Sequence, residues 1–174
     1  MTGRAVLTSR RAGLVALSAY AGSILAANFA SSGWPHLRVV ELDVPAGAVF
    51  AGLALTTRDL VQDVVGRRGV LVAIVLGAGL SWLVASPRIA SASAVAFAAS
   101  ELVDFTVYAA LGARSQQLAV AGSNTAGLLV DSALFVPLAF GTWAALPGQV
   151  AGKTASTVLA VGVLVVRSRC RAKP

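Results

Sequence analysis

Charged residues are scarce along most of this chain and gather in short connections and near the two ends. Only 12% of the 174 residues are charged, whereas 57% are hydrophobic, and the mean hydropathy is +0.80. An ordinary globular domain carries about 25% charged residues, so this chain has too few polar side chains to coat a water-soluble surface. The sequence therefore predicts an integral membrane protein.

Six stretches are apolar and long enough for membrane-spanning helices, which need about 20 residues each. They are residues 12–31, 45–65, 69–85, 88–111, 117–140 and 149–166. Pro45, Pro87 and Pro147 stand at or just before helix starts, whereas Pro137 should kink or end the fifth span. Because no strand alternation is sustained, we expect an all-α bundle of six transmembrane helices forming a single domain, residues 1–174. The third span is short, so the number of spans could differ by one.

Basic residues predict the orientation of this bundle. With the N-terminus inside, ten Lys and Arg residues lie in cytoplasmic segments and three, Arg38, Arg88 and Lys153, lie in outer segments. The ten are Arg4, Arg10, Arg11, Arg67, Arg68, Arg114, Arg167, Arg169, Arg171 and Lys173. This positive-inside bias predicts a multi-pass protein of the cytoplasmic (inner) membrane with both termini cytoplasmic.

The N-terminal stretch also has the parts of a signal peptide, namely a basic start, an apolar run and small residues near positions 27–30. Cleavage there is the alternative to a retained helix. Because apolar spans continue to the end of the chain, cleavage would leave no soluble product, and we expect the first helix to be retained.

Ionisable side chains inside the spans are the main functional signal, since each costs about 2.5 to 3.5 kcal/mol at membrane depth and usually faces a cavity or a partner. Phe97, Glu101, Asp104 and Tyr108 share one helical face, at spacings of four, three and four. Two further stripes share faces in the same way: Asn124, Asp131 and Phe135, and Gly47, Phe50, Ala54 and Arg58. Three such stripes predict a common interior site.

A structural role is the alternative for each of these groups. Arg58 could be an ion-pair partner of Asp104 or Asp131, and Tyr108 could belong to the aromatic belt at the membrane interface. Asp59, Gln62 and Asp63 could simply lie at the cytoplasmic end of the second span. Glu101 and Asp131 lie well inside their spans, so we expect both to line a substrate path.

Other function classes find little support in the sequence. His36 is the only histidine and lies in an outer loop, so a catalytic triad within the membrane is not available. Neither a metal-binding cluster nor a phosphate-binding loop is present, so we expect no enzyme, no metal and no cofactor. An aspartyl membrane protease built on Asp104 and Asp131 would lack its usual glycine motifs. The net charge of +7 lies mostly where lipid headgroups would be its neighbours, which argues against nucleic-acid binding.

Four blocks occur in the order and spacing of the VUT-type queuosine precursor transporters, which this chain resembles. They are "ANF", "VPAGAVFAGLALTTRDLVQDVVGRRG", "FAASELVDFTVYAAL" and "SNTAGLLVDSALFVPLAFG", and they span about residues 26–141. Arg58 with Asp59, Glu101 with Asp104, and Asn124 with Asp131 and Ser132 match the polar blocks of that family. The chain departs from the family in its short N-terminal arm, its trimmed loops and Arg58, where relatives carry a less charged block.

The resemblance implies import of a free 7-deazaguanine base, such as 7-cyano-7-deazaguanine, across the cytoplasmic membrane. A carboxylate can accept two adjacent N–H groups of such a base, and aromatic rings can stack on its plane. The candidate substrate-binding residues are Glu101, Asp131, Asn124, Asp104, Arg58, Phe97, Tyr108 and Phe50. Proton coupling and facilitated diffusion both fit, as does a homo-oligomer in the lipid bilayer.

Two other interpretations stay open at this stage. The chain has the size and helix count of a vitamin-binding subunit of an energy-coupling-factor transporter, which would copurify with ATPases. Alternatively, the acids could only hold helices together in a structural or assembly protein.

Overall fold

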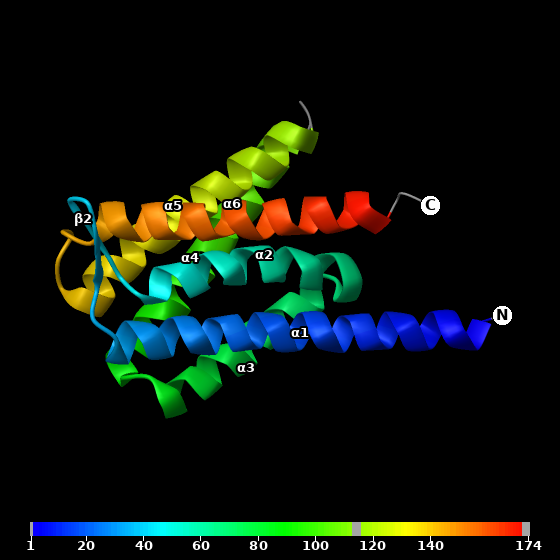
Figure 1. Ribbon diagram of the computed structural model, residues 1–174, viewed down its shortest axis with the longest axis horizontal. Helices are drawn as coiled ribbons and strands as arrows, with labels where there is room; N and C mark the ends of the chain where they lie inside the picture. Colours follow the sequence, from blue (N-terminus) through cyan, green and yellow to red (C-terminus); the bar gives the residue numbers. More distant parts are fainter. Residues whose placement is uncertain (1, 113–115, 172–174) are drawn as a thin grey trace.

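The computed structural model describes residues 2–112 and 116–171, which form six helices and one short β-hairpin (Figure 1). The elements in chain order are α1 (Thr2–Gly33), β1 (Leu37–Val39), β2 (Leu42–Val44), α2 (Gly47–Val65), α3 (Arg67–Val84), α4 (Pro87–Gly112), α5 (Gln116–Phe140) and α6 (Leu146–Arg171). The predicted all-helical architecture is confirmed, and Pro137 lies inside α5 one turn before its end. Arg114 and Lys173, two of the ten basic residues assigned to the cytoplasmic side, lie outside the described residues.

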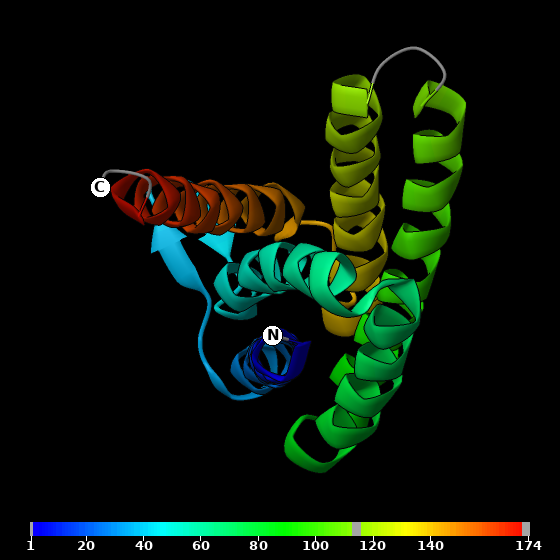
Figure 2. The same cartoon turned by 90° about the vertical axis from the view of Figure 1, so that its right-hand side faces the viewer.

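The helices divide into an antiparallel pair and a group that runs obliquely to it. Helix α4 packs chiefly against α5, and the two stand side by side (Figure 2). Helix α2 lies between α1 and α6 and contacts both, while α3 packs mainly on α1. The first turns of α1 and the last turns of α6 lie at the same end of the molecule (Figure 1).

Small residues let α2 and α6 approach closely. A Cβ placed on Gly52 would meet the backbone of Lys153 and the hydroxyl of Ser156, and a Cβ on Gly152 would come within 2.9 Å of the Ala48 side chain. Thr157 Oγ1 also donates to the Gly52 carbonyl at 3.1 Å. Since lipid offers no hydrophobic drive between helices, such close backbone packing is a main source of their association.

The β-hairpin lies at the end of the bundle opposite the first turns of α1 and the last turns of α6 (Figure 1). Its strands pair antiparallel with Leu37 opposite Val44, and His36 Nδ1 lies 3.0 Å from Asp43 Oδ2. The sequence did not predict this hairpin, because three-residue strands are too short for alternation to show. Strand β2 packs on the start of α6, so the hairpin helps to fix where that helix enters the bundle.

The outer surfaces of the helices are apolar. Among the described residues, three helices are long and apolar enough to cross a membrane, over Arg11–Gly33, Pro87–Leu111 and Ala121–Phe140, and Arg68–Val84 is a shorter apolar helix. Large side chains such as Leu83, Val75 and Leu102 are more than half exposed. Water would penalise such a surface, whereas lipid solvates it, so this is a membrane protein.

Candidate functional site

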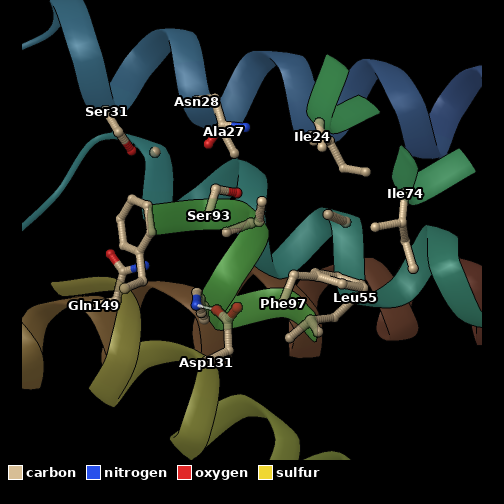
Figure 3. A pocket seen from close by; sticks show the side chains of 17 residues that line it. Ile24, Ala27, Asn28, Ser31, Leu55, Ile74, Ser93, Phe97, Asp131 and Gln149 are labelled. Carbon is tan, nitrogen blue, oxygen red and sulfur yellow. Dashed lines mark hydrogen bonds and ion pairs between the residues drawn. The ribbon is translucent and has the colours of Figure 1, made fainter. Parts of the chain in front are cut away.

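A cavity lies between the helices, and all six contribute residues to its wall (Figure 3). It encloses about 670 Å³ of empty space when its mouth is included. Pockets that hold small organic ligands have volumes of roughly 300 to 1,000 Å³, so this cavity is of a suitable size for one.

One charged pair lines the cavity. Lys153 on α6 binds Asp131 on α5 through Nζ and Oδ2, and Nζ also lies 3.3 Å from the Ser132 hydroxyl. The Lys153 side chain is 2% exposed and that of Asp131 is 16% exposed. Lys153, predicted to lie in an outer segment, is buried in the bundle, because helix packing turns its side chain inward to an acid. The two charges cancel, so the cavity wall carries no formal net charge.

Amide and hydroxyl groups form the rest of its polar lining. Asn28 Nδ2 donates to Ser81 Oγ at 2.7 Å, which fixes the Asn28 amide against α3. Gln149, on the first turn of α6, is 2% exposed, and its Oε1 has no hydrogen-bond partner within the described part of the chain. Ser31 and Ser93 complete this lining from α1 and α4.

Apolar side chains form the remaining walls. Phe97 and Phe135 line the cavity together with Ile24, Leu55 and Ile74. Phe97 lies against Tyr20, with ring centroids 6.4 Å apart, and Tyr20 is fully buried. Two aromatic rings beside a few polar groups form a suitable wall for a flat heterocycle.

A second charge cluster joins α2 to α4, one helical turn beyond Phe97. Arg58 Nε lies 2.6 Å from Glu101 Oε1, and its Nη2 donates to Glu101 Oε2 at 2.8 Å and to Asp104 Oδ2 at 3.2 Å. Asp59 Oδ1 lies 3.2 Å from Nη1, although its side chain is 51% exposed. The alternative in which Arg58 pairs with Asp104 is therefore confirmed, whereas Asp131, the other partner considered, pairs with Lys153.

Three carboxylates around one guanidinium give this cluster a formal charge of −2, since one positive charge faces three negative ones. Arg58 alone therefore does not neutralise the cluster. Among residues 2–112 and 116–171, no group of three or more His, Cys, Asp or Glu side chains is arranged so that it could hold a metal ion.

The sequence-predicted site residues thus separate into three groups. Asp131 and Phe97 lie in the cavity wall. Glu101, Asp104 and Arg58 form the ion cluster beside it, and none of the three lines the cavity.

Phe50, Tyr108 and Asn124 lie away from the cavity. Phe50 packs edge-on against Trp34 with centroids 6.1 Å apart, Tyr108 is 41% exposed, and Asn124 is exposed. The three stripes therefore do not lie wholly in one cavity, because each stripe is longer than the cavity and extends past it.

Sequence reasoning missed Lys153, Gln149 and Asn28 as members of the wall. Lys153 and Gln149 stand near the start of a span, where a polar residue ordinarily marks the interface. Their spacing of four residues was an available signal, because it places both on one face of α6.

Comparison with known proteins supports the predicted family. Residues 81–166, which include α4, α5 and most of α6, match the family model described as "Putative vitamin uptake transporter". This segment is similar to the VUT family of transporters. No curated protein and no solved structure matched the chain. The VUT match covers Glu101, Asp104, Asp131, Gln149 and Lys153, and therefore most of the polar groups described above.

Proposed function

We propose that this VUT-family protein imports a queuosine precursor, a free 7-deazaguanine base, across the cytoplasmic membrane. The observation that carries the proposal is the chemistry of the cavity: a formally neutral polar wall faces two phenylalanine rings. A neutral wall disfavours phosphorylated or strongly charged ligands. An uncharged, planar, hydrogen-bonding base satisfies the amides and stacks on the rings.

The paired charge in the wall supports the choice of a base over a nucleotide. Lys153 is already bound to Asp131, so a phosphate could use its ammonium only by separating the two. Nucleotides are accordingly expected not to be transported.

We further propose that all six helices cross the membrane with both termini in the cytoplasm. The terminal turns of α1 and α6 lie at one end of the molecule, as an even number of crossings requires (Figure 1). Lys153 is buried, so it is not counted among the loop charges. The count is then ten basic residues in cytoplasmic segments against two in outer segments. The pairing of Arg58 and Lys153 with carboxylates lowers the cost of placing α2 and α6 in lipid.

The excess negative charge around Arg58 supports proton coupling. Glu101 and Asp104 belong to the same cluster and are 20% and 18% exposed, so both are largely shielded by the surrounding helices. Uptake that follows an imposed pH gradient in vesicles supports coupling, whereas uptake that is indifferent to the gradient indicates facilitated diffusion.

The test of the proposed substrate is uptake in bacterial cells that cannot make the precursor. Cells that express the protein and receive 7-cyano-7-deazaguanine should regain queuosine in their tRNA. Asp131→Asn should abolish this recovery, and Asp63→Asn should not, since Asp63 is exposed on α2 away from the cavity. Unmodified tRNA despite normal amounts of membrane-inserted protein would refute the substrate.

A vitamin is the second candidate substrate, because the matching family is described by vitamin uptake. A vitamin-binding subunit of an energy-coupling-factor transporter would copurify with ATPases from its native membrane. Uptake that persists when the protein is reconstituted alone would reject that arrangement.

A further inference from the structure

Gln149 is a buried amide with unused hydrogen-bonding capacity. Its side chain is among the largest that are fully buried, and Oε1 has no partner among the described residues. An unmet buried polar group costs about 1 to 3 kcal/mol, so a protein retains one where something else completes it. The residue lines the cavity, so its side-chain amide belongs to the wall of the space where a ligand would bind.

The surroundings of Gln149 limit what can complete it. Lys153 lies one turn further along the same face of α6, but its ammonium is directed to Asp131 and Ser132. Asn28, across the cavity in Figure 3, has its Nδ2 directed to Ser81. Neither of these two donors is directed to Gln149, so a molecule that enters the cavity can supply the hydrogen bond that Oε1 lacks.

An amide offers an acceptor and donors side by side in one plane. The matching ligand group presents an N–H next to a C=O, as a lactam does, and forms two parallel hydrogen bonds. A carboxylate ligand has no N–H for Oε1, and an aliphatic ligand would leave the amide unpaired.

We infer that Gln149 is a specificity-determining residue that reads the lactam edge of the transported base, with Oε1 accepting from the ring N–H and Nε2 donating to the ring carbonyl. This inference rests on the proposed function, because it takes the 7-deazaguanine class as the substrate. It assigns the lactam edge to Gln149, and the second carboxylate oxygen of Asp131, whose Oδ2 binds Lys153, can accept from an exocyclic amino group.

The test compares two probes on detergent-purified full-length protein by isothermal titration. The probes are 7-deazaguanine and its N1-methyl derivative, in which the methyl group removes the lactam N–H and blocks its approach. Wild type should bind 7-deazaguanine at least tenfold more tightly than the methylated probe, because a site built around a hydrogen bond rejects an analogue that lacks it.

Gln149→Leu should lose this discrimination, with the two dissociation constants falling within about threefold of each other. Gln149→Met keeps a similar volume without the amide and serves if the leucine variant is unstable. Gln62→Leu is the matched control, since Gln62 is exposed on α2, and it should keep the full tenfold preference.

Each outcome decides between two claims. Equal binding of the two probes by wild type, or undiminished discrimination by Gln149→Leu and Gln149→Met, would overturn the role of Gln149 while leaving the proposed substrate intact. Absence of 7-deazaguanine binding to wild type would overturn the proposed function together with the inference that depends on it.

Discussion

Replacing either Lys153 or Asp131 alone leaves a charge inside the helix bundle without its partner. The ammonium is 2% exposed, and in Asp131→Asn it keeps only neutral partners, namely the new amide and the Ser132 hydroxyl at 3.3 Å. The Asp131 side chain is 16% exposed and borders the cavity, so water can partly solvate it after Lys153 is removed. We therefore expect Asp131→Asn to cost more stability than Lys153→Met.

The magnitude follows from the burial of both groups. Breaking a buried ion pair by removing one partner typically costs about 3 to 5 kcal/mol, because the other charge stays uncompensated. Asp131→Asn should fall near the upper value and Lys153→Met near the lower one. At roughly 2 to 4 °C per kcal/mol for a chain of this size, these losses correspond to about 6 to 20 °C in melting temperature.

The assay is thermal unfolding of the detergent-purified variants, followed by tryptophan fluorescence or by loss of the monodisperse peak. The double variant Lys153→Met with Asp131→Asn removes both charges and should recover much of the loss, which gives a coupling energy of about 2 kcal/mol or more. Asp63→Asn is the matched control and should shift the melting temperature little. Additive single effects below about 1 kcal/mol each would refute the claim that these residues form a buried pair.

Three further predictions follow from the same contacts. Glu101→Gln should lower the stability of the protein by about 1 to 3 kcal/mol in thermal unfolding. The reason is that it removes the carboxylate whose two oxygens lie 2.6 and 2.8 Å from the Arg58 guanidinium nitrogens. Retained stability together with lost uptake would instead assign Glu101 to transport. Gly52→Val should reduce the yield of folded protein in fluorescence-detected size exclusion, since its side chain meets the backbone of Lys153, and an unchanged yield would show that α2 and α6 can separate. Phe97→Ala should weaken binding of 7-deazaguanine about 5-fold to 100-fold by titration through the loss of about 1 to 3 kcal/mol of stacking, and an unaltered dissociation constant would place the base elsewhere.

Much of the fold could be read from the chain because each helix is a local feature. The boundaries of the apolar stretches came within a few residues of the helices at α2, α3, α4 and α5. Backbone hydrogen bonds in lipid must be satisfied within a segment, so a long apolar stretch leaves little choice but a helix. Helix α1 begins earlier and α6 ends later than predicted, because helices extend past their apolar parts into polar surroundings.

The candidate site could be predicted only in part. Spacing along α4 correctly placed Phe97, Glu101 and Asp104 on one face, and the structure directs the two acids to Arg58. Spacing alone does not say where along a face a cavity lies, so Glu101 and Asp104 were grouped with Asp131 although they lie beyond Phe97. Whether these acids bind substrate stays a prediction.

The sequence by itself determined that this is a helical membrane protein whose few intramembrane charges gather on a few helix faces. That much is local, since hydropathy and the helical repeat depend only on neighbours along the chain. Tertiary structure alone decided that Lys153 turns inward to Asp131 and that Arg58 is shared by Glu101 and Asp104. It also decided that Gln149 lines a cavity and that its Oε1 has no hydrogen-bond partner in the described part of the chain. The physical reason is that the partner of a buried polar group is set by which helices lie side by side, and that depends on packing between residues far apart in the chain.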